Sequence, residues 1–207
     1  MAICLQVCLA DSNPTPLFAL GPDETANAHL PWAFEAWESY ISGYRDAARA
    51  LVGDLESLVP EWAFYPIAFL YRHCVELQLK SLVLNSHCLL EQPATAPVGH
   101  DLKRLWTDAR TLVVQAGFDS ASDSLARTDQ TIDELTTADP SGQAFRYPLD
   151  LKGLPTLPTV TGVNIRDFSA RMDELVGFLL GLNEALHIQM QSNEEAEEEE
   201  VFWLGGY

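Results

Sequence analysis

A row of ionisable side chains interrupts a stretch of sequence that is otherwise mostly apolar. Arg72, Glu76 and Lys80 are spaced four residues apart, so on a helix they form one stripe. His73 would be rotated from Arg72 by about 100°. Burying an unpaired charge costs several kcal/mol, so these groups must be paired or must face a cavity. Arg and His together suit an anion such as phosphate, because one supplies a fork of donors and the other carries a proton near neutral pH.

Two later segments supply candidate partners for this stripe. One contains His100 and Asp101, at the predicted start of a helix, where an acidic residue favours the positive helix end. The other contains Arg146 and Tyr147, in a loop rich in Pro and Gly. One interpretation is a structural polar network that holds the helix start and the loop against the bundle, formed by Arg72, Glu76, Lys80, Asp101, Arg146 and Tyr147. The other is that some of these side chains also line an anion-binding pocket.

The same residue types would serve a metal-independent ribonuclease. A histidine would take the proton from the ribose 2′-hydroxyl, and a cation would stabilise the charge on a phosphorane-like transition state. The candidate catalytic residues are His73, Arg72, Lys80, His87, His100 and Arg146. A third interpretation is a metal-dependent hydrolase using His100-Asp101 with His73 and Glu76. That chemistry needs further His and Asp ligands, so we expect no metal and no cofactor.

The segments that must position these ionisable side chains show apolar residues at helical spacing, and patterns typical of β-strands are nearly absent. Five helices are predicted. The first spans about 32–59, and the second starts between 62 and 66 and ends at about 90. The others span 99–117, 120–137 and 164 onward. The second is apolar nearly all round, which is typical of a central, buried helix. The last carries an apolar seam formed by Ile165, Phe168, Met172, Leu175, Leu179, Leu182 and Leu186. The prediction is an all-α antiparallel bundle of four to five helices.

Composition and the character of the two chain ends predict the domain organisation. We expect an irregular N-terminal arm at 1–29, a helical bundle at 30–191 and an acidic tail at 192–207. Six glutamates between 194 and 200 repel one another at helical spacing, so the last helix should fray there. Phe202 and Trp203 beyond them are candidate partner-binding anchors. The formal net charge of −18 argues against indiscriminate binding to nucleic acid or anionic membranes.

Cysteine placement and the N-terminal composition predict a cytoplasmic protein. No stretch of 18 or more residues is free of charges and turn signals, so no membrane span is predicted. The N-terminus has no Lys or Arg before its mildly apolar residues, so no secretory signal is predicted. Cys74 and Cys88 would lie about 21 Å apart along one helix, too far for a disulfide. Cys4 and Cys8 form a lone C-x3-C with no second cysteine pair to complete a zinc site.

Three segments together resemble bacterial HEPN-like proteins. They are residues 68–80 (AFLYRHCVELQLK), 99–102 (GHDL) followed by Leu105-Trp106, and 145–150 (FRYPLD). The resemblance covers about 62–190 and implies a helical bundle that is commonly a homodimer. Many HEPN proteins are metal-independent ribonucleases of toxin–antitoxin, CRISPR and phage-defence systems, and others are non-catalytic modules associated with RNA or nucleotides.

The usual HEPN catalytic signature is an Arg followed, after four to six residues, by a His. This chain lacks it, and the nearest arrangement is Lys80 with six residues between it and His87. The sequence therefore predicts a non-catalytic or regulatory module of a bacterial defence, toxin–antitoxin or stress system that binds a partner protein or an RNA or nucleotide ligand. The alternative is an unusual metal-independent ribonuclease.

Overall fold

The computed structural model describes residues 16–30, 36–94, 96–118 and 123–204, with side chains up to residue 196. Helices and the turns and loops between them make up this part of the chain, which confirms the all-α prediction. The helices are α1 (Ala36–Gly53), α2 (Pro60–Leu89), α3 (Leu102–Gln115), α4 (Asp123–Ala138) and α5 (Ile165–Leu204), with two short 3-10 helices, η1 (Glu24–Ala26) and η2 (Leu55–Ser57).

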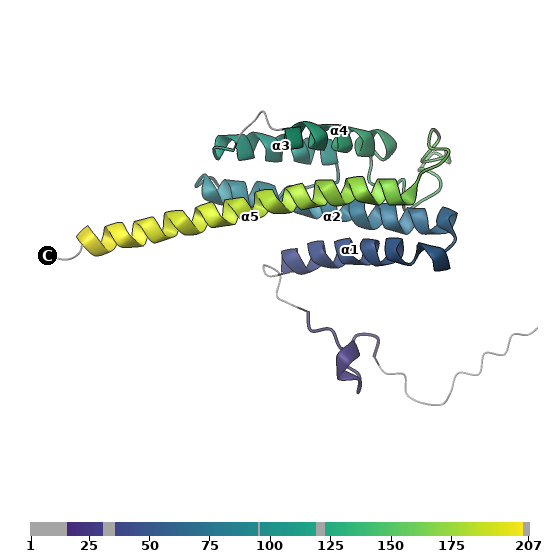
Figure 1. Ribbon diagram of the computed structural model, residues 1–207, viewed down its shortest axis with the longest axis horizontal. Helices are drawn as coiled ribbons and strands as arrows, with labels where there is room; N and C mark the ends of the chain where they lie inside the picture. The colour runs from purple at the N-terminus through teal and green to yellow at the C-terminus, as the bar shows by residue number, and fades with distance from the viewer. Residues whose placement is uncertain (1–15, 31–35, 95, 119–122, 205–207) are drawn as a thin grey trace, which may run out of the picture.

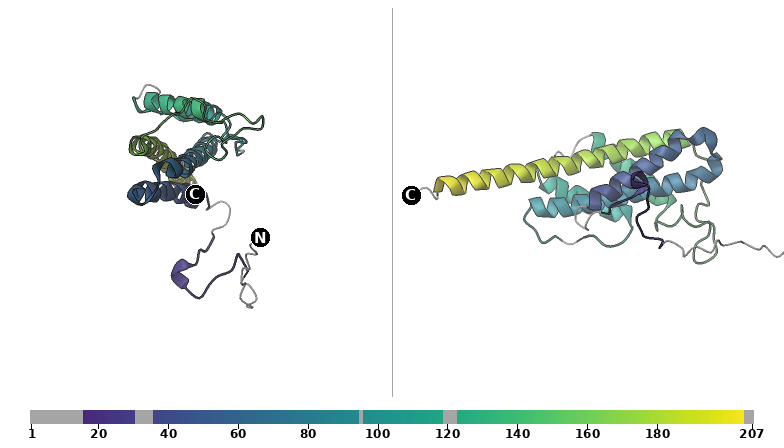
Figure 2. Two further views of the ribbon diagram at one scale, coloured as in Figure 1. Left: turned by 90° about the vertical axis from the view of Figure 1, so that its right-hand side faces the viewer. Right: turned by 90° about the horizontal axis from the view of Figure 1, so that it is seen from below.

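The bundle has three layers, with α2 and α5 in the middle, α3 and α4 on one side and α1 on the other (Figure 1). The end-on view shows the same order (Figure 2). The helix pairs α1–α2, α3–α4 and α4–α5 run antiparallel. The central pair, α2 and α5, runs in the same direction, as the contacts Tyr71–Ser169 and Asn85–Asn183 show by their equal sequence separation. This parallel arrangement is possible because α3 begins back beside the middle of α2, where His100 contacts Glu76 and Arg72. The α3–α4 hairpin then ends near the same place, with Asp139 beside Arg72.

The core follows the predicted apolar pattern. The middle of α2 is buried on most of its circumference, as expected for the central helix. Along α5, six of the seven seam residues are buried and Phe168 is partly buried against the same cluster. Full burial of each such side chain contributes roughly 1.5–3 kcal/mol, so this seam is a principal source of bundle stability.

Helix boundaries follow local chemistry. Helix α2 begins at Pro60, two residues before the earliest predicted start, because a first-turn proline lacks only an N–H that would be unpaired there. Helix α1 ends at Gly53, before the predicted Val59, and η2 occupies most of the remaining link. The predicted start of this helix, at Trp32, lies outside the described residues. The Asn164 side chain caps α5, accepting hydrogen bonds from the backbone N–H groups of Arg166 (3.0 Å) and Asp167 (3.2 Å).

The acidic segment does not interrupt α5, and the prediction that the helix frays there is wrong. The helix continues to Leu204 and projects beyond the bundle (Figure 1). Glutamate is a good helix former, and each like-charge pair costs only about 0.2–0.5 kcal/mol, so backbone hydrogen bonding prevails. The side chains of Phe202 and Trp203 lie outside the described residues, as do Cys4 and Cys8.

Both described cysteines are free, with Cys74 buried and Cys88 exposed. Burial raises the pKa of the Cys74 thiol to about 12, so this thiol is inert at neutral pH. Within the described part of the chain, no helix combines the length and the apolar character that a membrane crossing requires.

Candidate functional site

The Glu76 carboxylate lies at the centre of the charged stripe on α2. Its side chain is 2% exposed and accepts hydrogen bonds from Lys80 Nζ and His100 Nδ1, both at 2.8 Å, and from Arg72 Nη1 at 3.2 Å. Burial would raise the pKa of Glu76, but the hydrogen bonds from Lys80 and His100 more than offset this effect and lower the pKa. Glu76 is therefore an ionised, buried carboxylate that accepts hydrogen bonds from three cationic or histidine side chains.

The Arg72 guanidinium is buried and all its contacts are with other groups of the protein. Its side chain is 5% exposed, and Nη2 donates to the backbone carbonyl of His100 at 2.7 Å. On its other side, Nε lies 3.0 Å from Oδ2 of Asp139, an ion-pair contact in which neither atom forms a well-aligned hydrogen bond. With Nη1 bound to Glu76, all three nitrogens of this group face protein partners, and none is free for a phosphate.

Asp139 and Gly142 complete this cluster, and the sequence analysis missed both. Asp139 Oδ1 accepts the backbone N–H groups of Gln143 (2.8 Å) and Ala144 (3.0 Å), which fixes the loop that follows α4. Gly142 has φ +74°, and a Cβ there would lie 2.9–3.0 Å from the Arg72 guanidinium. The available signal was Asp-Pro-Ser-Gly at 139–142, a turn composition directly after a predicted helix. We call Arg72, Glu76, Lys80, His100, Asp139 and Gly142 the buried ionic cluster.

His100 is the member of the cluster that is most open to solvent. Its side chain is 65% exposed, compared with 15% for Lys80. Because the ionised Glu76 can only accept, His100 Nδ1 must carry the proton of their hydrogen bond. In a neutral ring Nε2 then has a free lone pair, which gives the site one oriented proton acceptor beside one ammonium group.

Asp101 does not belong to the polar network that the sequence predicted. It is exposed and caps α3, accepting a hydrogen bond from the backbone N–H of Arg104 at 3.1 Å. A carboxylate at this position turns toward the unpaired N–H groups of its own helix, and its backbone places the neighbouring His100 against α2 instead.

Arg146 and Tyr147 lie beside the buried ionic cluster and form no ion pair with it. Arg146 Nε donates to the carbonyl of Gly142 at 3.1 Å, and its guanidinium lies 5.9 Å from the ring centroid of Phe69 and 5.6 Å from that of Tyr147. Both Arg146 and Tyr147 are exposed. They cover the outside of the loop and do not contribute charge to Glu76.

The two remaining histidine candidates are separated from the cluster. His73 stacks on Phe69 with ring centroids 5.8 Å apart and meets the edge of Tyr44 at 4.5 Å. Burial lowers the pKa of His73, so this ring is neutral at neutral pH. His87 lies two turns beyond Lys80, where its Nδ1 is 3.1 Å from Oε1 of Gln92. Of the six candidate catalytic residues, the structure therefore brings only Arg72, Lys80 and His100 together.

Among the described residues, no group of three or more His, Cys, Asp or Glu side chains has the arrangement of a metal site. Comparison with protein-family models, with curated proteins and with solved structures finds no match to this chain.

Proposed function

We propose that this chain is a HEPN-like helical module of a bacterial defence, toxin–antitoxin or stress system, located in the cytoplasm, that acts by binding and not by cutting RNA. The three segments that carry the resemblance meet around one cluster, which supports treating them as a unit. Residues 68–80 supply Arg72 and Glu76, residues 99–102 supply His100, and residues 145–150 follow the loop fixed by Asp139.

The observation that carries the non-catalytic proposal is the enclosure of Arg72. To contact a phosphate, its guanidinium would have to leave Glu76, Asp139 and the carbonyl of His100. Breaking a buried pair of this kind costs about 3–5 kcal/mol, whereas one new charge-assisted hydrogen bond returns about 1.5–3 kcal/mol. The arginine therefore serves to hold α2, α3 and the loop after α4 together.

Overall charge favours a protein partner over RNA or a nucleotide. A formal charge of −18 repels a phosphate backbone at long range, while it attracts a basic surface. Two copies of this chain would also repel one another through this charge, so a homodimer, which the family resemblance implies, needs a well-packed apolar interface.

The alternative, a metal-independent ribonuclease, is favoured by one observation. Glu76 orients the exposed His100 ring through Nδ1, and the Lys80 ammonium binds the same carboxylate oxygen. A carboxylate-oriented histidine beside a cation is an arrangement that can remove a hydroxyl proton and stabilise a nearby negative charge.

RNA cleavage and binding assays on the intact chain distinguish the two functions. Labelled RNA is incubated with the wild-type protein, with His100→Ala and with His87→Ala, a matched loss of a histidine outside the cluster. We expect intact RNA in every case, and co-purification of the product of the adjacent gene when the two are expressed together. Cleavage that is lost in His100→Ala and kept in His87→Ala would establish the ribonuclease instead. Failure of the adjacent gene product, RNA and nucleotides to bind would overturn the binding proposal.

A further inference from the structure

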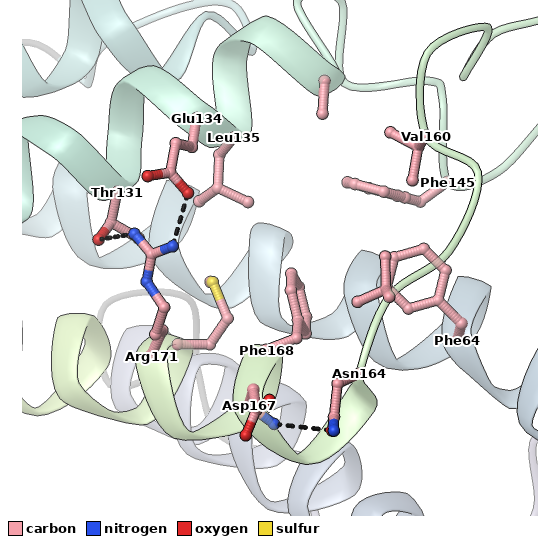
Figure 3. A pocket seen from close by; sticks show the side chains of 13 residues that line it. Phe64, Thr131, Glu134, Leu135, Phe145, Val160, Asn164, Asp167, Phe168 and Arg171 are labelled. Carbon is pink, nitrogen blue, oxygen red and sulfur yellow. Dashed lines mark hydrogen bonds and ion pairs between the residues drawn. The ribbon is translucent and has the colours of Figure 1, made fainter.

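A cavity of about 360 Å³ opens between α2, α4, α5 and the loop that joins α4 to α5 (Figure 3). Its wall includes the rings of Phe64, Phe145 and Phe168 together with Leu135 and Met172. This volume falls within the range of roughly 300–1,000 Å³ typical of small-molecule sites. The buried ionic cluster is a different region and contributes no side chain to this wall.

The three phenylalanines form an aromatic enclosure. The Phe64 ring lies 5.9 Å from that of Phe145 at 90° and 5.6 Å from that of Phe168 at 77°. In Figure 3 the three rings come from α2, α5 and the connecting loop and line one side of the open space, with Leu135 on the other side. Aromatic faces carry partial negative charge, so a cation near them is attracted as well as enclosed.

The polar rim of the cavity also favours a cation. Arg171 donates to Glu134 at 2.6 Å and to Thr131 Oγ1 at 3.3 Å, so its positive charge is already neutralised. The hydrogen bond from Arg171 lowers the pKa of Glu134, which keeps this pair ionised at neutral pH. The Asp167 carboxylate has no hydrogen bond or ion pair among the described residues and lies in the first turn of α5, where a negative charge interacts favourably with the helix dipole. The rim therefore carries one unbalanced negative charge.

An anion would find few free donors at this rim. The first-turn N–H groups of Arg166 and Asp167, which could otherwise bind an anion, already donate to the Asn164 side chain. Arg171 already pairs with the Glu134 carboxylate, which would repel an anion that approached the remaining N–H groups of this guanidinium. The two features together disfavour carboxylates and phosphates, so the cavity is better suited to neutral or positive molecules.

We propose that this cavity binds a small organic cation with an aromatic body. The rings of Phe64, Phe145 and Phe168 contact the apolar part, and Asp167, on the rim, supplies the negative charge for the ammonium group. The buried ionic cluster has a role in this site through Phe145, because Asp139 fixes the backbone of the preceding Ala144. The proposal rests on the cavity alone and stands whether or not the chain is a HEPN-like module.

The test compares two probes with one aromatic body and opposite charges, 2-naphthylmethylammonium and 2-naphthoate. Their dissociation constants are measured by calorimetry on the full chain at neutral pH. We expect the cation to bind at least tenfold more tightly than the anion. Asp167→Asn should weaken binding of the cationic probe about tenfold. Glu184→Gln, which removes a charge from an exposed position on the same helix, should leave the affinity for this probe unchanged.

A cavity-filling variant locates the bound probe. Val160→Trp changes a partly exposed loop residue on the cavity wall, so the bundle should fold and cation binding should be lost. Circular dichroism and a cooperative thermal melt check the fold of each variant. The proposal is overturned if the two probes bind equally or not at all. It is also overturned if Glu184→Gln weakens binding of the cationic probe as much as Asp167→Asn does, or if folded Val160→Trp still binds this probe.

Discussion

Substitution of Gly142 by alanine should destabilise the protein through its contact with Arg72. Two costs add at this position. The backbone has φ +74°, where a Cβ costs about 1–2 kcal/mol. The new Cβ would also lie 2.9–3.0 Å from three atoms of a guanidinium that is itself held by Glu76, Asp139 and the carbonyl of His100. Overpacking of this kind costs about 1–3 kcal/mol, so we expect a total of about 3 kcal/mol.

Gly153→Ala is the matched control, because its φ is +77° and nothing lies within 4 Å of a Cβ built there. It should show the backbone cost alone, about 1–2 kcal/mol. For a chain of this size 1 kcal/mol lowers Tm by about 2–4 °C, so the melting temperature should fall by roughly 6–12 °C for Gly142→Ala and by about 2–8 °C for Gly153→Ala. Equal melting temperatures for the two variants would refute the idea that Gly142 packs tightly against a fixed arginine.

Three further predictions concern the cluster, the C-terminal segment and pH. Arg72→Ala should lower the free energy of unfolding by about 3–5 kcal/mol, since it leaves the buried Asp139 without its ion-pair partner and Glu76 without one of its three donors, whereas Asp101→Ala should cost about 1 kcal/mol for a lost helix cap. Urea unfolding measures both, and comparable losses would contradict the different positions of these residues. Deleting residues 193–207 should reduce helical ellipticity but leave a cooperative melt near the wild-type Tm, because residues 193–196 are exposed; loss of the cooperative melt would show that the segment stabilises the bundle. Burial lowers the pKa of His73, so below about pH 6.5 the unfolded chain takes up a proton that the folded state does not. Stability should therefore fall as pH drops through this value, and His73→Phe should flatten the change in urea midpoint between pH 7.5 and 5.5; an unchanged slope would show that this ring does not control it.

The periodic elements were the predictable part of this protein. The α5 seam, the buried character of α2 and the Asn164 cap all follow from short-range spacing of side chains. The convergence of His100 on Glu76 was also foreseeable, because a charged stripe on a buried helix needs partners and few segments could supply them.

The carboxylate that pairs with Arg72 Nε could not be predicted from the sequence in the same way. Asp101 was a candidate partner for the charged stripe, but the carboxylate beside Arg72 Nε is that of Asp139, whose position depends on where α4 ends and how α4 packs across the bundle. Arg146 was expected to carry charge into the cluster, whereas its Nε instead binds the Gly142 carbonyl. Pairing across a loop of this length depends on tertiary geometry that local spacing does not encode.

The continuous backbone of α5 has a consequence for physical measurements on this protein. Eighteen residues follow Leu186, the last buried residue of the seam, and at 1.5 Å each they extend the helix by about 27 Å. A fluorophore or spin label attached near Leu204 would therefore be held at a defined distance and direction from the bundle. Energy transfer or dipolar spectroscopy between that label and one on α1 should give a narrow distance distribution.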